Sequence, residues 1–182
     1  MKELSLNILD IVENSTKAGS TLTIIEIIEK GEKLELIITD NGCGMSQEIL
    51  EGVTNPFYTT RTTRKVGLGI PLLKQEAELT GGSFNITSKV KTEASTDHGT
   101  KVSASFFKSH IDFTPLGDVI STVVTLIQGH PDKDFLFIHK IDEKEIRLDT
   151  RELRRELEDI PLNSFEILNW IREYLKEQYI GK

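Results

Sequence analysis

The chain has 182 residues, and its 22 basic and 29 acidic side chains give a formal net charge of -7. This acidic balance disfavours broad binding to nucleic acids or anionic membranes, so neither is an expected partner. No apolar run reaches the roughly 18 residues that cross a bilayer, and the N-terminal residues lack the apolar stretch of a signal peptide; we therefore expect a cytoplasmic protein. One cysteine allows neither an internal disulfide nor a cysteine-based metal site.

Hydrophobic periodicity and turn residues predict a first unit over residues 1–108. Its first helix, at about 3–18, directs Leu4, Ile8, Ile11 and Val12 inward. Strands at 21–29 and 33–39, a short helix at 46–53, a helix at 68–80 and strands at 83–91 and 100–108 follow. This order predicts an α/β fold, a two-layer α/β sandwich.

Residues 109–182 are expected to form a small α+β extension. Its predicted elements are a helix at 116–128, a hairpin of strands at 135–141 and 145–148, and helices at 150–158 and 163–179. The last helix carries a stripe of apolar residues at helical spacing: Phe165, Leu168, Ile171 and Leu175. We expect this stripe to pack against the hairpin of the extension, and docking of a partner is the alternative.

A hydroxyl-rich, cationic loop runs directly into a Gly-x-Gly helix start at residues 56–70. Glycines let the backbone approach a ligand closely, and the free N–H groups of a first helical turn attract anions. The segment therefore predicts a phosphate site, although a solvated basic loop is the alternative for its three cations. The candidate ligands are Thr59, Thr60, Arg61, Arg64, Lys65, Gly67, Leu68 and Gly69.

Two upstream segments point to a nucleotide as the phosphate ligand. Asp10, Asn14 and Lys17 are spaced i, i+4 and i+7, so a helix places all three on one face. A carboxylate, an amide and an ammonium group together suit a magnesium-bound triphosphate. Asp40 ends the apolar run of residues 34–39 and leads into a turn that contains Gly42 and Gly44.

In this order and spacing, the three segments resemble the GHKL ATPase superfamily, which includes type II topoisomerase and heat-shock chaperone ATPase domains, sensor histidine kinases and MutL proteins. The resemblance covers about residues 1–108 and implies the Bergerat fold with ATP and Mg²⁺ as ligands. It implies that Asn14 is the Mg²⁺ ligand, that Lys17 contacts phosphate and that Asp40 bonds the adenine amino group. The remaining nucleotide contacts implied by the matching motifs are Gly42, Gly44, Met45, the second glycine box at 66–70 and Thr100.

The sequence departs from this superfamily at two places. Lys65 and Val66 replace the first Gly-Thr of the usual lid motif, so one flexible position has become a cation. Asp10 stands where MutL-like and gyrase-like ATPases carry the glutamate that activates water, and where many histidine kinases carry asparagine. Asp10 is therefore the candidate catalytic residue, and the choice between hydrolysis and transfer stays open at this stage.

The expected function is that of an ATP-dependent enzyme without its own phosphoacceptor, because none of the four histidines lies in a helix resembling an acceptor segment. Such an enzyme would phosphorylate a separate regulatory protein in trans, as a kinase. The alternative is an ATP-gated switch that docks to its partner without phosphorylating it. A homodimer is a further arrangement that the sequence leaves open.

Overall fold

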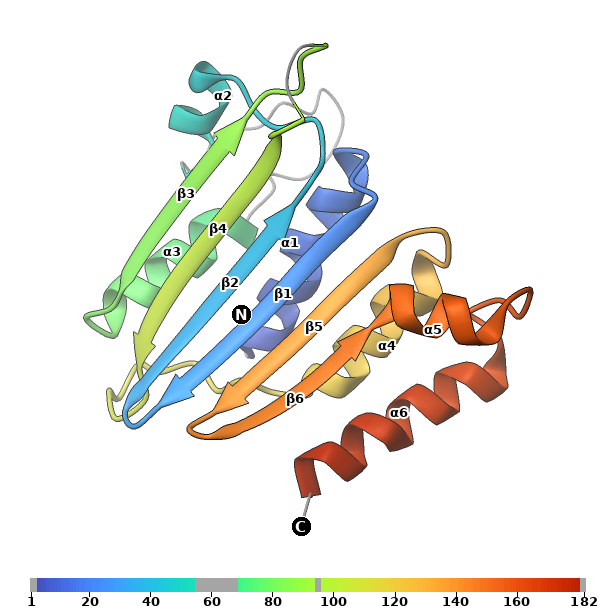
Figure 1. Ribbon diagram of the computed structural model, residues 1–182. Helices are drawn as coiled ribbons and strands as arrows, with labels where there is room; N and C mark the ends of the chain where they lie inside the picture. Colours follow the sequence, from blue (N-terminus) through green and yellow to red (C-terminus); the bar gives the residue numbers. More distant parts are fainter. Residues whose placement is uncertain (1–2, 55–68, 94–95, 181–182) are drawn as a thin grey trace.

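The computed structural model describes residues 3–54, 69–93 and 96–180 (Figure 1). None of the described helices is both long and apolar enough to cross a membrane. The elements in chain order are α1 (Leu4–Lys17), β1 (Leu22–Lys30), β2 (Lys33–Asp40), α2 (Gln47–Gly52), α3 (Gly69–Leu79), β3 (Ser83–Lys89), β4 (Gly99–Phe107), α4 (Val119–Gly129), β5 (Asp134–Ile141), β6 (Lys144–Asp149), α5 (Thr150–Leu157) and α6 (Phe165–Ile180).

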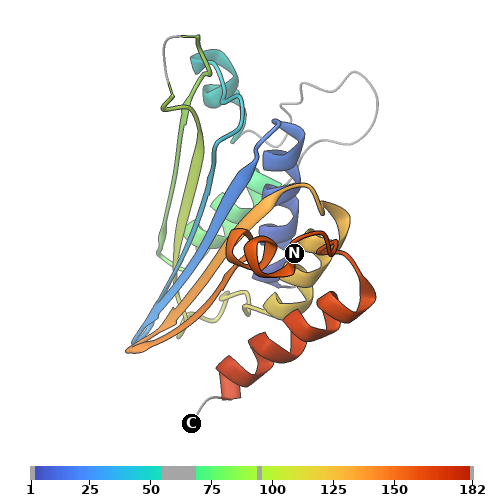
Figure 2. The ribbon, with the colours of Figure 1, turned by 45° about the vertical axis from the view of Figure 1, so that its right-hand side comes forward.

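One six-stranded sheet organises the molecule, in the order β3-β4-β2-β1-β5-β6. All neighbouring strands are antiparallel except β1 and β5, which are parallel. Helices α1, α3 and α4 lie behind the sheet in Figure 1, and the turned view of Figure 2 shows them on the same face. The predicted two-layer α/β fold is confirmed.

The core lies between the sheet and these helices. Leu4, Ile8, Ile11 and Val12 of α1 are buried, as their spacing predicts. The inward residues of the strands alternate with outward ones, and those of β5 and β6 belong to the same apolar cluster as those of β1 and β2. Each square ångström of apolar surface removed from water stabilises the fold by about 25 cal/mol. This shared core is therefore the main contribution to the stability of the protein.

The extension joins the sheet of the first unit. Strand β5 pairs with β1 along its whole length, from Leu22 opposite Asp134 to Glu29 opposite Ile141. Helix α1 has no side-chain cap at its start, and its N–H groups at Leu4 and Ser5 donate instead to the carbonyls of Pro115 and Leu116. The boundary predicted near residue 108 therefore falls inside one sheet.

Two predictions for the extension need correction. Helix α4 begins at Val119 rather than at residue 116, because Gly117 has a φ of +77° and Asp118 caps the helix by accepting a hydrogen bond from the N–H of Ser121. The side chain of Phe165 was expected to point inward but is 78% exposed, whereas Leu162 in the preceding turn is buried at this end of the core.

The rest of the stripe on α6 packs as predicted. Leu168, Ile171 and Leu175 are buried, and α6 contacts α4 as well as strand β6 of the hairpin. Helix α6 also covers the β6 edge of the sheet, since the side-chain amide of Gln178 both accepts from the N–H and donates to the carbonyl of Arg147. Such pairing blocks a free edge that another strand would otherwise join.

A buried polar cluster fixes the end of α6. The imidazole of His139 on β5 lies 3.0 Å from the Glu29 carboxylate and 2.7 Å from the Tyr179 hydroxyl. Burial lowers the pKa of His139 below its ordinary value, in spite of the opposing effect of Glu29. The cluster therefore joins α6 to β1 and β5 through His139. The lowered pKa favours the neutral form of this histidine.

We expect Leu175→Ala to lower the free energy of unfolding by about 2–5 kcal/mol, because the side chain is fully buried between α6 and its neighbours. The matched control is Phe165→Ala on the same helix. Because Phe165 is exposed, this variant should change the free energy of unfolding by less than about 0.5 kcal/mol. Urea denaturation followed by circular dichroism measures both values. Equal losses in the two variants would contradict the observed packing of α6.

Candidate functional site

The Asp40 carboxylate lies at the C-terminal end of β2 and is 9% exposed. Its Oδ1 atom accepts a hydrogen bond from the N–H of Gly42 at 2.8 Å. Its Oδ2 atom accepts one from the hydroxyl of Ser15 on α1, also at 2.8 Å. Each carboxylate oxygen has two lone-pair directions, so Asp40 is oriented by the protein and can still accept from a ligand donor such as an amino group.

The turn after Asp40 is fastened to two other segments. The N–H of Cys43 donates to the carbonyl of Ala18 at 2.9 Å, and the carbonyl of Cys43 accepts from Lys91 at 2.8 Å. Gly44 has a φ of +69°, and a side chain at this position would collide with the carbonyl of Lys89. A glycine is therefore required where the turn passes against the end of β3.

Thr100 and Met45 meet across the same end of the sheet. Thr100 pairs with Asp40 in the register of β4 and β2, and its hydroxyl lies 2.9 Å from that of Ser88. The Ser88 hydroxyl also accepts from the N–H of Met45 at 2.8 Å. The structure thus brings Asp40, Gly42, Gly44, Met45 and Thr100 together at one end of the sheet, and their common role in binding a nucleotide stays a prediction.

Helix α1 carries the predicted phosphate and metal residues. Asp10 and Asn14 are partly exposed on it, one turn apart, and Lys17 is its last residue and exposed. Gly69, the first residue of α3, packs so closely on Asp10 that a side chain there would collide with the carboxylate. The start of α3 and the catalytic candidate are therefore in contact, although 59 positions separate them in the sequence.

The other predicted phosphate ligands lie outside the described residues. They are Thr59, Thr60, Arg61, Arg64, Lys65, Gly67 and Leu68, so their roles stay predictions.

Sequence reasoning missed two residues of this site. Ser15 orients Asp40 from α1, and its position beside Asn14 on a helix that carries the predicted phosphate residues was an available signal. The second residue is His98, whose Nδ1 atom lies 2.7 Å from the carbonyl of Gly42. A carbonyl oxygen only accepts, so the imidazole donates from Nδ1.

Residues 1–110 match the family described as histidine kinase-, DNA gyrase B-, and HSP90-like ATPases. Because the match spans more than half of the 182 residues and the site has the geometry described above, the chain belongs to this family.

Curated relatives match over about half of the chain. Sporulation kinase D of Bacillus subtilis is 34% identical over 92 residues, which are 50% of this chain and 18% of that protein. The sensor protein KdpD of Clostridium acetobutylicum is 30% identical over 94 residues, 49% of this chain and 10% of the relative. Human mismatch repair endonuclease PMS2 is 27% identical over 110 residues, 54% of this chain and 13% of the relative. The chain thus spans less than a fifth of the length of these relatives.

Solved structures share the fold. The Aquifex aeolicus MutL ATPase domain complexed with ADP has a TM-score of 0.54 at 15% identity, covering 100% of this chain and 70% of that one. The N-terminal domain of a DNA repair protein has a TM-score of 0.58 at 17% identity, covering 82% of this chain and 53% of that one. Both similarities reach beyond residue 108, so the shared fold includes residues of the extension.

We expect His98→Ala to loosen the Asp40–Gly44 turn, because Gly42 loses the bond to its carbonyl. One hydrogen bond contributes about 0.5–1.5 kcal/mol, so the amides of Gly42 and Cys43 should exchange about two- to tenfold faster. His98→Asn places an amide donor near the position of Nδ1 and should restore protection, whereas His98→Gln should not. Hydrogen exchange measured by nuclear magnetic resonance distinguishes them, and equal exchange in all four proteins would exclude this role.

Proposed function

We propose that the chain binds Mg-ATP and transfers the γ-phosphate to a separate regulatory protein, as a kinase acting in trans. The observation that carries this proposal is the contact between Asp10 and Gly69. It puts a carboxylate at the start of a helix, and the N–H groups of a first helical turn attract phosphate. A phosphate at this helix start would therefore have a potential proton acceptor beside it.

The geometry around Asp40 supports an adenine site near the C-terminal end of α1. Ser15 and Gly42 hold the carboxylate in one orientation, and the acceptor directions that remain match an exocyclic amino group. Helix α1 carries Asp10 and Ser15 little more than one turn apart along its axis, so the base and phosphate ends of a nucleotide would both be positioned from this helix.

The residues present also fit a magnesium ion. Among the described residues, no cluster of three or more histidine, cysteine, aspartate or glutamate side chains could hold a metal. Mg²⁺ bound with a nucleotide takes most of its ligands from phosphates and water, so one protein oxygen such as that of Asn14 is sufficient. The ion would neutralise phosphate charge, while Asn14 would fix its place on α1.

Asp10 would act as the general base. A carboxylate at this position can take a proton from a water molecule or from a hydroxyl group of the partner, which an asparagine cannot do. Transfer to a hydroxyl would resemble a serine kinase, whereas a histidine acceptor supplies its own nucleophile and needs no base. The contact of Asp10 with the start of α3 favours the first of these acceptors.

The second candidate function is an ATP-gated switch, which one feature of the extension favours. The start of α1 donates to the carbonyls of Pro115 and Leu116, and Glu13 on α1 bonds to His130 at the end of α4 at 2.8 Å. A nucleotide that moved α1 would therefore also move the extension. A partner docked there would respond to ATP without being phosphorylated.

Asp40→Ala should weaken ATP binding roughly ten- to a hundredfold, because a hydrogen bond to a charged group contributes about 1.5–3 kcal/mol. Isothermal titration calorimetry with Mg-ATP measures the change, and circular dichroism confirms that the variant is folded. Unchanged affinity in a folded variant would exclude Asp40 as the adenine ligand.

Asp10→Asn should leave ATP affinity nearly intact and reduce turnover by about 10²–10⁴, the usual contribution of a general base. Glu13→Gln is the matched control, because Glu13 lies on the same helix and bonds to His130 rather than to α3. A weaker response to Mg²⁺ with no loss of turnover would show that Asp10 only orders the metal environment. Full turnover at every Mg²⁺ concentration would exclude the general-base role.

Transfer and switching can be separated with ATP labelled at the γ-phosphate and a soluble extract of the source cells. A protein that retains label with the wild type but not with Asp10→Asn would support transfer. Release of labelled inorganic phosphate without any labelled protein would favour the switch.

A further inference from the structure

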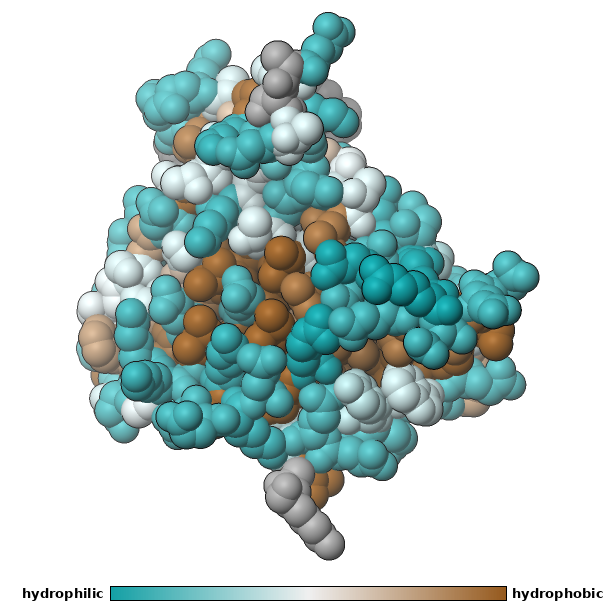
Figure 3. Space-filling model, in the orientation of Figure 1, coloured by the Kyte–Doolittle hydropathy of each residue, from teal (hydrophilic) through white to brown (hydrophobic). Residues whose placement is uncertain are grey.

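The outer face of the sheet has an apolar centre. Strands β1, β2 and β5 are apolar on the face that packs against the helices and also expose Ile24, Ile28, Ile37, Leu136 and Ile138 on the opposite face, each of them partly exposed. Figure 3 shows apolar side chains gathered over β1 and β2 in the middle of this face. Strands that are apolar on both faces are typical of sheets covered on both sides.

A single carboxylate lies at the centre of this patch. Glu26 on β1 pairs in register with Ile37 of β2 on one side and Ile138 of β5 on the other. Along β1 its neighbours on the same face are Ile24 and Ile28. Four isoleucines therefore surround one acidic group. A sheet face that only contacts water would be expected to carry polar side chains at these positions.

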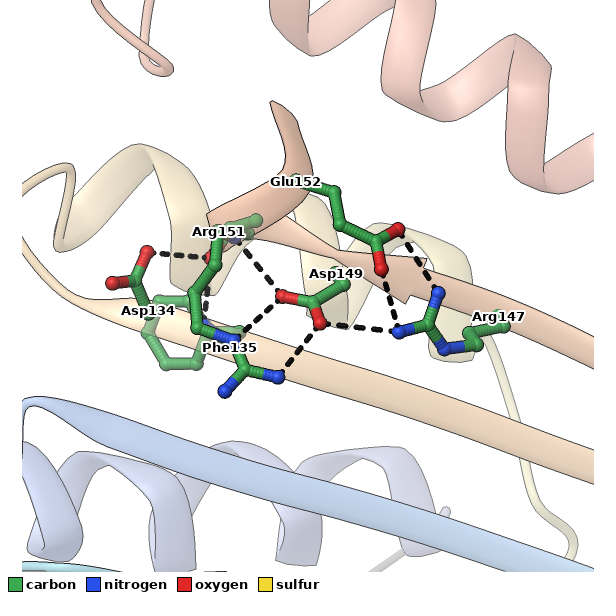
Figure 4. A network of polar contacts seen from close by, with 7 residues as sticks. Asp134, Phe135, Arg147, Asp149, Arg151 and Glu152 are labelled. Carbon is green, nitrogen blue, oxygen red and sulfur yellow. Dashed lines mark hydrogen bonds and ion pairs between the residues drawn. The ribbon is translucent and has the colours of Figure 1, made fainter. Parts of the chain in front are cut away.

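Three cations of the outer face are paired with other carboxylates. Lys33 lies 3.9 Å from Glu35, and Lys140 lies 3.5 Å from Glu145. Arg147, opposite Ile138 on β6, bonds to Glu152 and Asp149 (Figure 4). Within residues 3–54, 69–93 and 96–180, no side chain forms an ion pair or hydrogen bond with the Glu26 carboxylate.

We propose that this outer face, centred on Glu26, docks an amphipathic segment of another protein that carries a lysine or arginine among aliphatic side chains. Apolar side chains of the segment would cover the isoleucines, and its cation would pair with Glu26 as water leaves. Covering Glu26 without a cation would leave a buried, unpaired charge, which is strongly unfavourable. This inference does not depend on nucleotide binding.

The same carboxylate disfavours a second copy of the chain as the occupant. A symmetric, face-to-face pair centred on the patch would bring two Glu26 side chains into one apolar layer, where like charges repel. Glu26 therefore selects for a basic partner and against self-association, as a charge placed within an apolar surface commonly does.

Two synthetic peptides test the proposal. Both are 15 residues long, helical and amphipathic, with leucines along one face; one has lysine at the centre of that face and the other has glutamate. Titration into the ¹⁵N-labelled full chain, without nucleotide, should shift the amide signals of β1, β2 and β5. We expect at least about tenfold tighter binding of the lysine peptide, since each 1.4 kcal/mol is tenfold in affinity.

Glu26→Lys should reverse the preference between the peptides, while Ile37→Thr should weaken binding of both. Glu143→Lys is the matched control, because it makes the same charge change at an exposed position in the β5–β6 turn and should preserve the preference. Absence of saturable binding, or a preference that survives Glu26→Lys, would overturn the proposal. A dimer found by analytical ultracentrifugation whose formation is lost in Ile37→Thr would overturn it in favour of a second copy.

Discussion

The site depends on the way in which the protein holds one carboxylate. Asp40 ends a central strand, and its two oxygens are bonded to Ser15 on α1 and to the backbone of Gly42. These bonds join the helix layer, the sheet and the glycine turn at a single group. Because α1 also carries Asp10 and Asn14, the orientation of Asp40 is coupled to that of the residues proposed to act on phosphate.

A second constraint is the close packing of segments that are distant in the sequence. Gly69 touches the Asp10 carboxylate, and Gly44 lies so close to the carbonyl of Lys89 at the end of β3 that a side chain there would collide with backbone. Both glycines therefore have a structural role that does not depend on a ligand. Each lets its segment approach a second element closely, which is a common use of glycine.

The extension gives this family member features outside the proposed nucleotide site. It supplies the carbonyls that complete the first turn of α1, adds β5 and β6 to the sheet and covers the free edge with α6. The proposed docking face spans β2 and β1 of the first unit and β5 of the extension. A partner bound there would contact the strand that ends in Asp40, so the proposed docking face and the proposed nucleotide site would share β2.

Local sequence patterns determined most of the fold and part of the site. The spacing of Asp10, Asn14 and Lys17 placed them on one helix face, and periodicity located the strands and helices to within a few residues, because these properties depend on neighbours in the chain. The tertiary structure decided the contacts that span long separations: His98 on the turn of Gly42, Ser15 on Asp40 and β5 beside β1. It also decided that Phe165 is exposed while Leu162 is buried, since helical spacing defines a stripe but only the packing of α6 fixes where the stripe meets the core. Likewise, the isoleucines around Glu26 form one surface only because strand register aligns three segments of the chain.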